Sequence, residues 1–455
     1  MRLPMLLAAL AIGLTGCAPA PGSDVSKAAF NPPLALPGPV PLRSFAPTQA
    51  PAAQRSNAEM AQDFLDLNFR MESGRSLPVL TRFETPVTVA LTGHVPASAQ
   101  SDLSALLSRL QSEAGLAIRQ TNGPAAITLD FQPRSALSRA VPSAACFVVP
   151  NVTGLADYRK KRGSAAVDWG RLPSRTQIAV MLASDSSPQE LRDCLHEELA
   201  QALGPLNDLF RLPDSVFNDD NFHSVLTGFD MLMLRVHYDS ALRSGMTEAQ
   251  VAARLPAILA RLNPAGQNVA GRPKGISPRA FLSATQTAFG ANAGARASGA
   301  ARMLTLARAE GWTDGRLAFS LYAQGRALTA RDSVAATEAY AQAAQIWRSL
   351  PGGQIHAAHV DMQLAAFALS SGQDDAVLFL TSRALPVARS HQNASLLASL
   401  LAMQAEALGR LGRGAEARLA RLDSLAWARY AFGSEDKVRA RMADIAALAR
   451  RGARG

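Results

Sequence analysis

The chain has 455 residues, 48% of them hydrophobic, which is enough apolar material for two domains with separate cores. Its three cysteines form no C-x-x-C pair and no cluster with histidine, so we expect no structural zinc site. The formal net charge of +10 comes largely from arginine, much of it in the C-terminal region around Arg439–Arg454. A basic surface in this region either binds anionic lipid headgroups and other acidic envelope polymers or is a solvated arginine-rich helix face.

The N-terminus has the pattern of an export signal. Met1-Arg2 is followed by an apolar run over 3–14 and then by Leu14-Thr-Gly-Cys17. A charged start, a short apolar core and small residues before a cleavage point indicate a secretory signal peptide over 1–16, and the run is too short to span a bilayer. The L-x-G-C sequence resembles the lipobox of bacterial lipoproteins, which implies that Cys17 carries the lipid that binds the protein to a membrane.

This N-terminus also predicts the compartment. Ala18 rather than Asp follows the lipidated cysteine, so we expect a protein anchored in the bacterial outer membrane and facing the periplasm. An exported protein of this kind is not expected to have a nucleic-acid partner. Residues 17–55 are predicted to be an extended linker, because pieces such as Leu36-Pro-Gly-Pro-Val-Pro41 favour stiff chain over a packed core.

The next stretch, residues 56–262, has the pattern of an α+β domain. Runs rich in β-branched residues predict strands at 86–91, 125–131, 146–149 and 177–182. Leucines at helical spacing predict a helix over 97–114, and a second helix over 187–203 follows the last strand. Alternating strands and helices predict one mixed sheet.

The most informative stretch of the domain is Cys194-Leu-His-Glu-Glu-Leu-Ala-Gln-Ala-Leu-Gly-Pro-Leu-Asn-Asp208. Its layout resembles the zinc helix of metzincin proteases, H-E-x-x-H-x-x-G-x-x-H/D, in which histidines one turn apart hold the metal and a glutamate activates water. In a frame shifted by one residue, His196 would be the first ligand, but Ala200 would then occupy the second position and cannot bind a metal. The other open interpretation is an ordinary amphipathic helix that ends at Gly204. The resemblance assigns the metal-ligand positions, the base and the turn as follows: Glu197, Gln201 and Asn207 as ligands with Asp208 beside the third, Glu198 as base and Gly204 at the turn.

Two further segments extend the resemblance. Ser215-Val-Phe217 is similar to the S-I-M turn that lies under the metal in serralysins and astacins, with phenylalanine in place of methionine. The stretch from Leu226 to Tyr238 is similar to the closing helix of these proteases, and Thr227 followed by Asp230 also has the spacing of a helix start. Because the three segments occur in the right order, residues 56–262 resemble a degenerate metzincin-like domain, and the chain resembles an uncharacterised family of bacterial lipoproteins.

The loss of the zinc histidines has chemical consequences. Glu197, Gln201 and Asn207 or Asp208 offer hard oxygen donors, which suit calcium or magnesium better than zinc. Without a Lewis acid that lowers the pKa of water, Glu198 has little to act on. We therefore expect no cofactor, although a divalent metal is possible, and a buried hydrogen-bonded cluster of the Glu, Gln and Asn side chains in place of the metal.

These residues predict a protein that acts in recognition or scaffolding and is more consistent with a pseudo-peptidase than with an enzyme. The alternative is a divergent metal-dependent peptidase that acts on envelope peptide or protein, with Glu198 as general base. A purely structural envelope protein is the third possibility. His223 and His237 lie near the motif, but either is more often a surface or core residue than a ligand.

The two remaining cysteines, Cys146 and Cys194, are expected to pair in an oxidising periplasm. A bridge would join the motif helix to the edge strand at 146–149 and, from loop entropy, would stabilise the fold by roughly 4 kcal/mol. Two unlinked core thiols are the alternative.

Residues 263–455 are predicted to form an all-α domain, because the composition shifts to Ala, Leu and Arg with little β-branching. Three helical-hairpin units recur at about forty residues, with Ala336, Ala376 and Ala415 at similar places. Small-residue turns such as Ala405-Glu-Ala-Leu-Gly-Arg-Leu-Gly412 resemble those of tetratricopeptide arrays, whose usual period is ~34 residues, and both a solenoid and a compact bundle stay open. Stacked hairpins commonly present a concave surface to a partner, so binding of a protein partner is one hypothesis for this domain.

Overall fold

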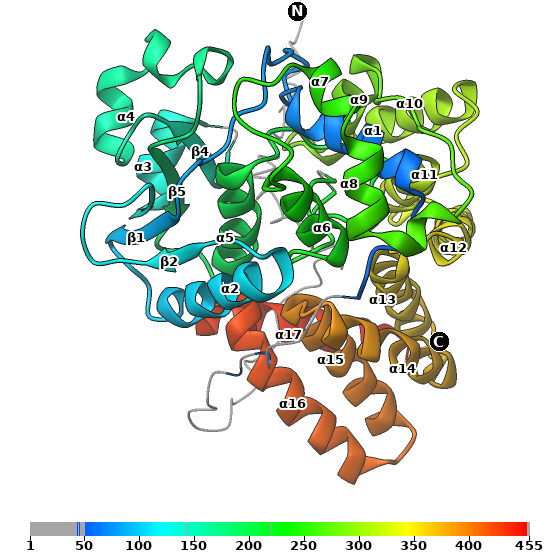
Figure 1. Cartoon of the computed structure of the whole chain (residues 1–455). Coiled ribbons are helices and arrows are strands. Elements are labelled where there is room, and N and C mark those ends of the chain that lie inside the picture. The colour runs from blue at the N-terminus through cyan, green and yellow to red at the C-terminus, as the bar shows by residue number, and fades with distance from the viewer. Residues whose placement is uncertain (1–42, 44, 46–50, 143, 219, 453–455) are drawn as a thin grey trace, which may run out of the picture.

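The structure is a computed structural model that describes residues 43, 45, 51–142, 144–218 and 220–452. A mixed α/β domain with a five-stranded sheet is followed by an all-helical region (Figure 1), which confirms the predicted fold class. The predicted signal peptide, Cys17 and most of the linker lie outside the described residues. Among the residues that are described, no helix is long and apolar enough to cross a membrane.

The sheet contains β1 (Val87–Gly93), β2 (Ile118–Gln120), β3 (Ile127–Gln132), β4 (Phe147–Pro150) and β5 (Ile178–Ala183). Its order is β2-β1-β3-β5-β4, and all neighbours are parallel except β4, the edge strand antiparallel to β5. Every residue of β5 is buried, as expected for a strand with helices on both faces. Four of the strands fall where the sequence predicts them, and β2 is missed because three residues carry no pattern.

Helices cover both faces of this sheet. α3 (Arg134–Ala140) and α4 (Leu155–Lys161) lie against the face formed by alternate residues of β5, including Ala179 and Met181. The opposite face packs on α5 (Pro188–Leu203), which in turn contacts α2 (Ala99–Ala114). The motif helix α5 therefore occupies the centre of the domain (Figure 1).

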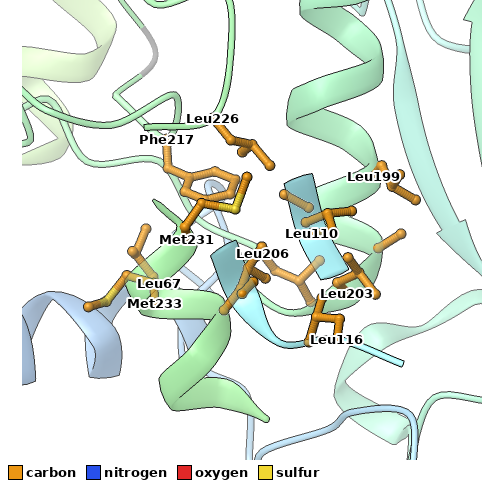
Figure 2. Packing of buried hydrophobic residues seen from close by; sticks show 14 of the residues in the cluster. Leu67, Leu110, Leu116, Leu199, Leu203, Leu206, Phe217, Leu226, Met231 and Met233 are labelled. Atoms are coloured by element: carbon orange, nitrogen blue, oxygen red, sulfur yellow. The ribbon is translucent and has the colours of Figure 1, made fainter. Parts of the chain in front are cut away.

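The remaining helices of the domain surround α5 and continue its core. α6 (Gly228–His237) packs on α2 and on α8 (Leu255–Leu262), while α1 (Asn57–Asn68) packs on α7 (Glu248–Ala252) and α8. Figure 2 shows the apolar contacts between α5, the segment that follows it and α6. The labelled buried residues are Leu67, Leu110, Leu116, Leu199, Leu203, Leu206, Phe217, Leu226, Met231 and Met233.

The helical region consists of α9 (Arg279–Phe289), α10 (Arg296–Ala309) and three antiparallel hairpins, followed by α17 (Glu435–Gly452). The second helices of the hairpins begin at Ser333, Asp374 and Gly414, close to the expected period of about forty residues. The last helix, α17, packs back against α13 and α15. The hairpins are α11 (Gly315–Leu328) with α12 (Ser333–Ser349), α13 (Gln354–Ser370) with α14 (Asp374–Ser390), and α15 (Ala394–Arg410) with α16 (Gly414–Phe432).

The two parts of the chain share a buried interface. Phe210 and Phe222, from the connection between α5 and α6, belong to the core of the helical region, with their rings 5.6 and 6.2 Å from the ring of Phe319. α16 packs on α5, and the side chain of Gln189 accepts a hydrogen bond of 3.0 Å from the backbone N–H of Ala394. The connection that follows the motif helix thus lies between the two parts.

Candidate functional site

The motif helix α5 has well-defined ends. Ser187 is its N-cap and forms a capping box with Glu190, and Pro188 occupies the first turn. At the other end, buried Arg175 donates hydrogen bonds to the carbonyl oxygens of Gln201 (2.6 Å), Ala202 (2.8 Å) and Gly204. A cation here complements the helix dipole and satisfies carbonyls that have no partner within the helix. The role of Arg175 is missed from the sequence, because an isolated arginine before a strand carries no pattern.

Gly204 lies at the predicted turn, and a neighbouring ring explains why it is glycine. A Cβ atom at this position would lie 3.2 Å from two atoms of the His237 imidazole. His237 is buried, and its Nε2 lies 3.2 Å from the carbonyl oxygen of Thr81. Burial, together with the charges of Arg175 and Arg82, holds the pKa of His237 well below its usual value of 6.5. His237 therefore acts as a neutral core residue that packs on the turn.

The residues that the sequence predicts at metal-ligand positions are distributed along α5 and the segment that follows it. Glu197 is half-buried and Gln201 is buried, both on α5. Asn207 is also buried, and its Nδ2 donates a hydrogen bond of 2.9 Å to the backbone carbonyl of Asp66, so this side chain ties the segment after α5 to α1. Asp208 is half-buried and shares a hydrogen bond with the side chain of Glu72, in the turn after α1.

Glu198, the residue predicted as general base, lies in an unfavourable environment for a charge. Its side chain is buried, and its Oε2 has no hydrogen-bond partner in the described part of the chain. Burial, and then the negative charges of Glu197 and Glu72, raise the pKa of Glu198 well above its usual value of 4.5. This shift favours the protonated carboxyl group, whereas a general base must be ionised to accept a proton.

The nearby histidines have structural roles. The Nδ1 atom of His196 accepts a hydrogen bond of 3.1 Å from the backbone N–H of Leu226 at the start of the closing helix. Burial holds the pKa of His196 well below 6.5, which keeps this acceptor unprotonated. His223 lies 3.0 Å, through Nε2, from the carbonyl oxygen of Pro213, and its ring contacts the rings of His356 and His391 at 5.4 and 5.5 Å.

The turn at Ser215–Phe217 is held against the start of α6. The Oγ atom of Ser215 donates to the carboxylate of Asp230 and accepts a hydrogen bond of 3.0 Å from the backbone N–H of Phe217. Asp230 also accepts from the backbone N–H of Thr227, the N-cap of α6, at 2.7 Å and completes a capping box. Phe217 is fully buried beside Leu226 and Met231 (Figure 2). The turn and the closing helix therefore form one hydrogen-bonded unit under α5.

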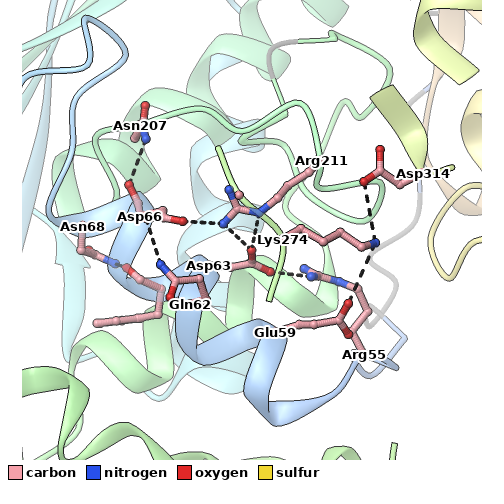
Figure 3. Close-up of polar contacts among 12 residues, drawn as sticks. Arg55, Glu59, Gln62, Asp63, Asp66, Asn68, Asn207, Arg211, Lys274 and Asp314 are labelled. Atoms are coloured by element: carbon pink, nitrogen blue, oxygen red, sulfur yellow. Dashed lines mark hydrogen bonds and ion pairs between the residues drawn. The ribbon is translucent and has the colours of Figure 1, made fainter. Parts of the chain in front are cut away.

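A buried ionic network ties this unit to α1 (Figure 3). The Nε of Arg211 donates to Asp63 at 2.9 Å, and its Nη2 donates to Asp66 at 2.8 Å. Arg55 pairs with Asp63 and, at 3.0 Å, with Asp214. The exposed fraction of these side chains is at most 11%. The network links residues separated by up to 159 positions, so no local pattern in the sequence indicates it.

Cys146 and Cys194 form a disulfide, with Cα atoms 6.0 Å apart. Cys146 directly precedes β4, and Cys194 lies within α5. The bridge thus connects the edge strand of the sheet to the motif helix. Within the described ranges, no group of three or more His, Cys, Asp or Glu side chains is arranged to hold a metal ion.

The fold defines an α/β domain with a mixed five-stranded sheet, which packs on the motif helix α5. Residues 57–257 match the family described as "Protein of unknown function (DUF2927)". The chain therefore contains a DUF2927 domain, which begins with α1 and extends into α8, followed by a helical C-terminal region. No curated protein and no solved structure matches the chain.

Proposed function

We propose that this protein is a lipid-anchored lipoprotein of the outer membrane whose degenerate metzincin-like domain acts in recognition or scaffolding. The burial of the segment after α5 carries the proposal. All residues from 204 to 218 are buried except Asp208 and Val216, which are half-buried. A catalytic zinc site keeps one coordination position open to water and substrate. Here the corresponding segment is instead packed between the DUF2927 domain and the helical region, through Phe210 and Phe222.

The chemistry of the remaining residues supports the same function. Glu198, the residue predicted as general base, is buried, and its burial and acidic neighbours raise its pKa well above 4.5, which disfavours the ionised form of a base. Asn207 contacts α1, and His196 contacts the start of α6, so both side chains stabilise the fold. An intact scaffold with a buried carboxyl group at this position supports a binding role over hydrolysis.

Two features of the sequence support the location and the partner. Cys17 follows the lipobox-like Leu14-Thr-Gly sequence and would carry the anchor. The three successive hairpins of the helical region resemble tetratricopeptide units and offer surfaces for a periplasmic protein partner. The anchored chain would hold such a partner at the outer membrane.

A protease assay tests the loss of catalysis. The full-length protein with Cys17→Ser, which we expect to leave the membrane fraction, is incubated with casein with and without added zinc. We expect no cleavage above the buffer control, and the same result for a Glu198→Gln variant, because Glu198 is buried and its raised pKa disfavours the ionised form that a base requires. Zinc-dependent cleavage that Glu198→Gln abolishes would contradict the proposal and identify a divergent peptidase.

A further inference from the structure

A groove on the helical region, lined by exposed apolar side chains together with charged ones, is not used by the proposed site. It has a volume of about 1050 Å³ and lies between α14 and α16, with α15 as its floor. Phe379 of α14 and Leu419 and Leu422 of α16 line it, with exposed fractions of 62%, 69% and 49%. Large apolar side chains that are gathered and exposed in this way mark an interaction site.

The N-terminal part of the chain reaches one end of this groove. Arg43 lines it and pairs with Asp423 of α16 at 3.2 Å. Phe45 stacks on Trp427, one turn further along α16, with a ring distance of 4.4 Å, and the guanidinium of Arg192 from α5 lies 5.4 Å from the ring of Phe45. These contacts fix the chain at the junction of α16 with α5, directly beside the exposed leucines.

The sequence just before Arg43 has the chemistry that the groove requires. Residues 34–42 read Leu-Ala-Leu-Pro-Gly-Pro-Val-Pro-Leu, with no charge and three prolines. In a polyproline II conformation these nine residues would extend roughly 28 Å. The helical path from Asp423 to Glu416 is only about 10 Å. Proline-rich segments bind to apolar, aromatic-lined grooves with a small loss of conformational entropy.

We propose that residues 34–42 of the same chain dock in the groove between α14 and α16. The docked segment covers Phe379, Leu419 and Leu422, and its C-terminal end leads directly into the contacts of Arg43 and Phe45. Docking also shortens the tether, because only the stretch from Cys17 to residue 33 then separates the anchor from the folded body. This consequence for the tether rests on the lipid anchor of the proposed function, whereas the docking does not.

Cysteine cross-linking tests the docking in the full-length chain with Cys17→Ser. Val40→Cys is combined with Leu419→Cys, and the matched control combines Val40→Cys with Val334→Cys, whose position on α12 is equally exposed at 68%. Under mild oxidation we expect an intramolecular 40–419 disulfide to form about tenfold faster than the control, because docking raises the effective concentration of the two thiols. Non-reducing electrophoresis and peptide mass spectrometry identify the linked pair.

The other outcomes overturn the proposal. Equal rates for the two pairs would show that the segment does not occupy the groove. Disulfides between two chains through position 419, with a rate that rises with protein concentration, would show that a second copy covers the groove instead. Leu419 in the groove and Val334 in the control are both solvent-exposed, so neither substitution removes a core side chain. Neither result depends on membrane anchoring or on catalysis, so failure here is distinguishable from failure of the proposed function.

Discussion

Replacement of Arg211 by methionine is expected to lower the free energy of unfolding by about 3–5 kcal/mol, because it removes the buried cation that bridges Asp63 and Asp66. The guanidinium of Arg211 bridges Asp63 and Asp66 of α1 at 2.9 and 2.8 Å. All three side chains are almost inaccessible to water, so water cannot replace the lost hydrogen bonds. Urea unfolding followed by circular dichroism at pH 7 measures the effect.

Arg413→Met is the matched control for this variant. Arg413 forms a bidentate pair with Glu416, but both side chains are about half exposed. Water screens an exposed pair of this kind, so the stability of the control should lie close to that of the wild type. If Arg211→Met were no more destabilising than Arg413→Met, the network in Figure 3 would not hold α1 against the segment after α5.

The free energy of unfolding of a His359→Gln variant is expected to fall less on acidification from pH 7 than that of the wild type. His359 lies against Phe222, at a ring distance of 4.7 Å, and burial together with the neighbouring His356 and His391 lowers its pKa to about 3. The unfolded chain takes up this proton near pH 6.5, whereas the folded chain does not until about pH 3. The contribution of neutral His359 to the free energy of unfolding is therefore fully present above pH 6.5 and is lost as the pH falls toward about 3.

The expected size follows from linkage. Between pH 6.5 and pH 4 the free energy of unfolding of the wild type falls by about 1.4 kcal/mol per pH unit through this one group. The difference in the free energy of unfolding between the two proteins therefore shifts by about 3 kcal/mol in favour of His359→Gln. Urea unfolding of both proteins at several pH values measures the slope, which is independent of any constant cost of the substitution. His94→Gln, at an exposed position, is the matched control for the substitution itself. Parallel curves for His359→Gln and the wild type would contradict the buried, neutral state of this histidine.

The parts of the fold that follow from local patterns are those predicted most closely. Ser187 with Glu190, and Thr227 with Asp230, mark the starts of α5 and α6, because a capping box is complete within four residues. The ends of β5 are within one residue of the prediction, because its apolar run is continuous. The short β2 and the helix α1 are not predicted: β2 has three residues, and α1 buries Asp63 and Asp66 on the side that packs inward.

The candidate site is predictable only in part, for the same physical reason. The order of motif helix, turn and closing helix is visible in the sequence, as is glycine at the turn. The partners of these residues are not, because Arg175, Asp66 and Leu226 reach the motif from other elements. The insertion of Phe210 and Phe222 into the helical region also depends on contacts with residues about one hundred positions away.

The metal content of the purified protein tests the central claim most directly. Full-length protein with Cys17→Ser, produced in the periplasm, is dialysed against zinc and analysed by elemental mass spectrometry beside Glu197→Ala and Glu198→Ala variants. We expect no zinc or other divalent metal above background in any of the three folded proteins, because the residues predicted at the ligand positions, Glu197, Gln201 and Asn207, offer no histidine nitrogen. Nearly one zinc ion per chain, lost in the Glu197→Ala variant, would contradict the proposed loss of the zinc site and would identify a metallopeptidase.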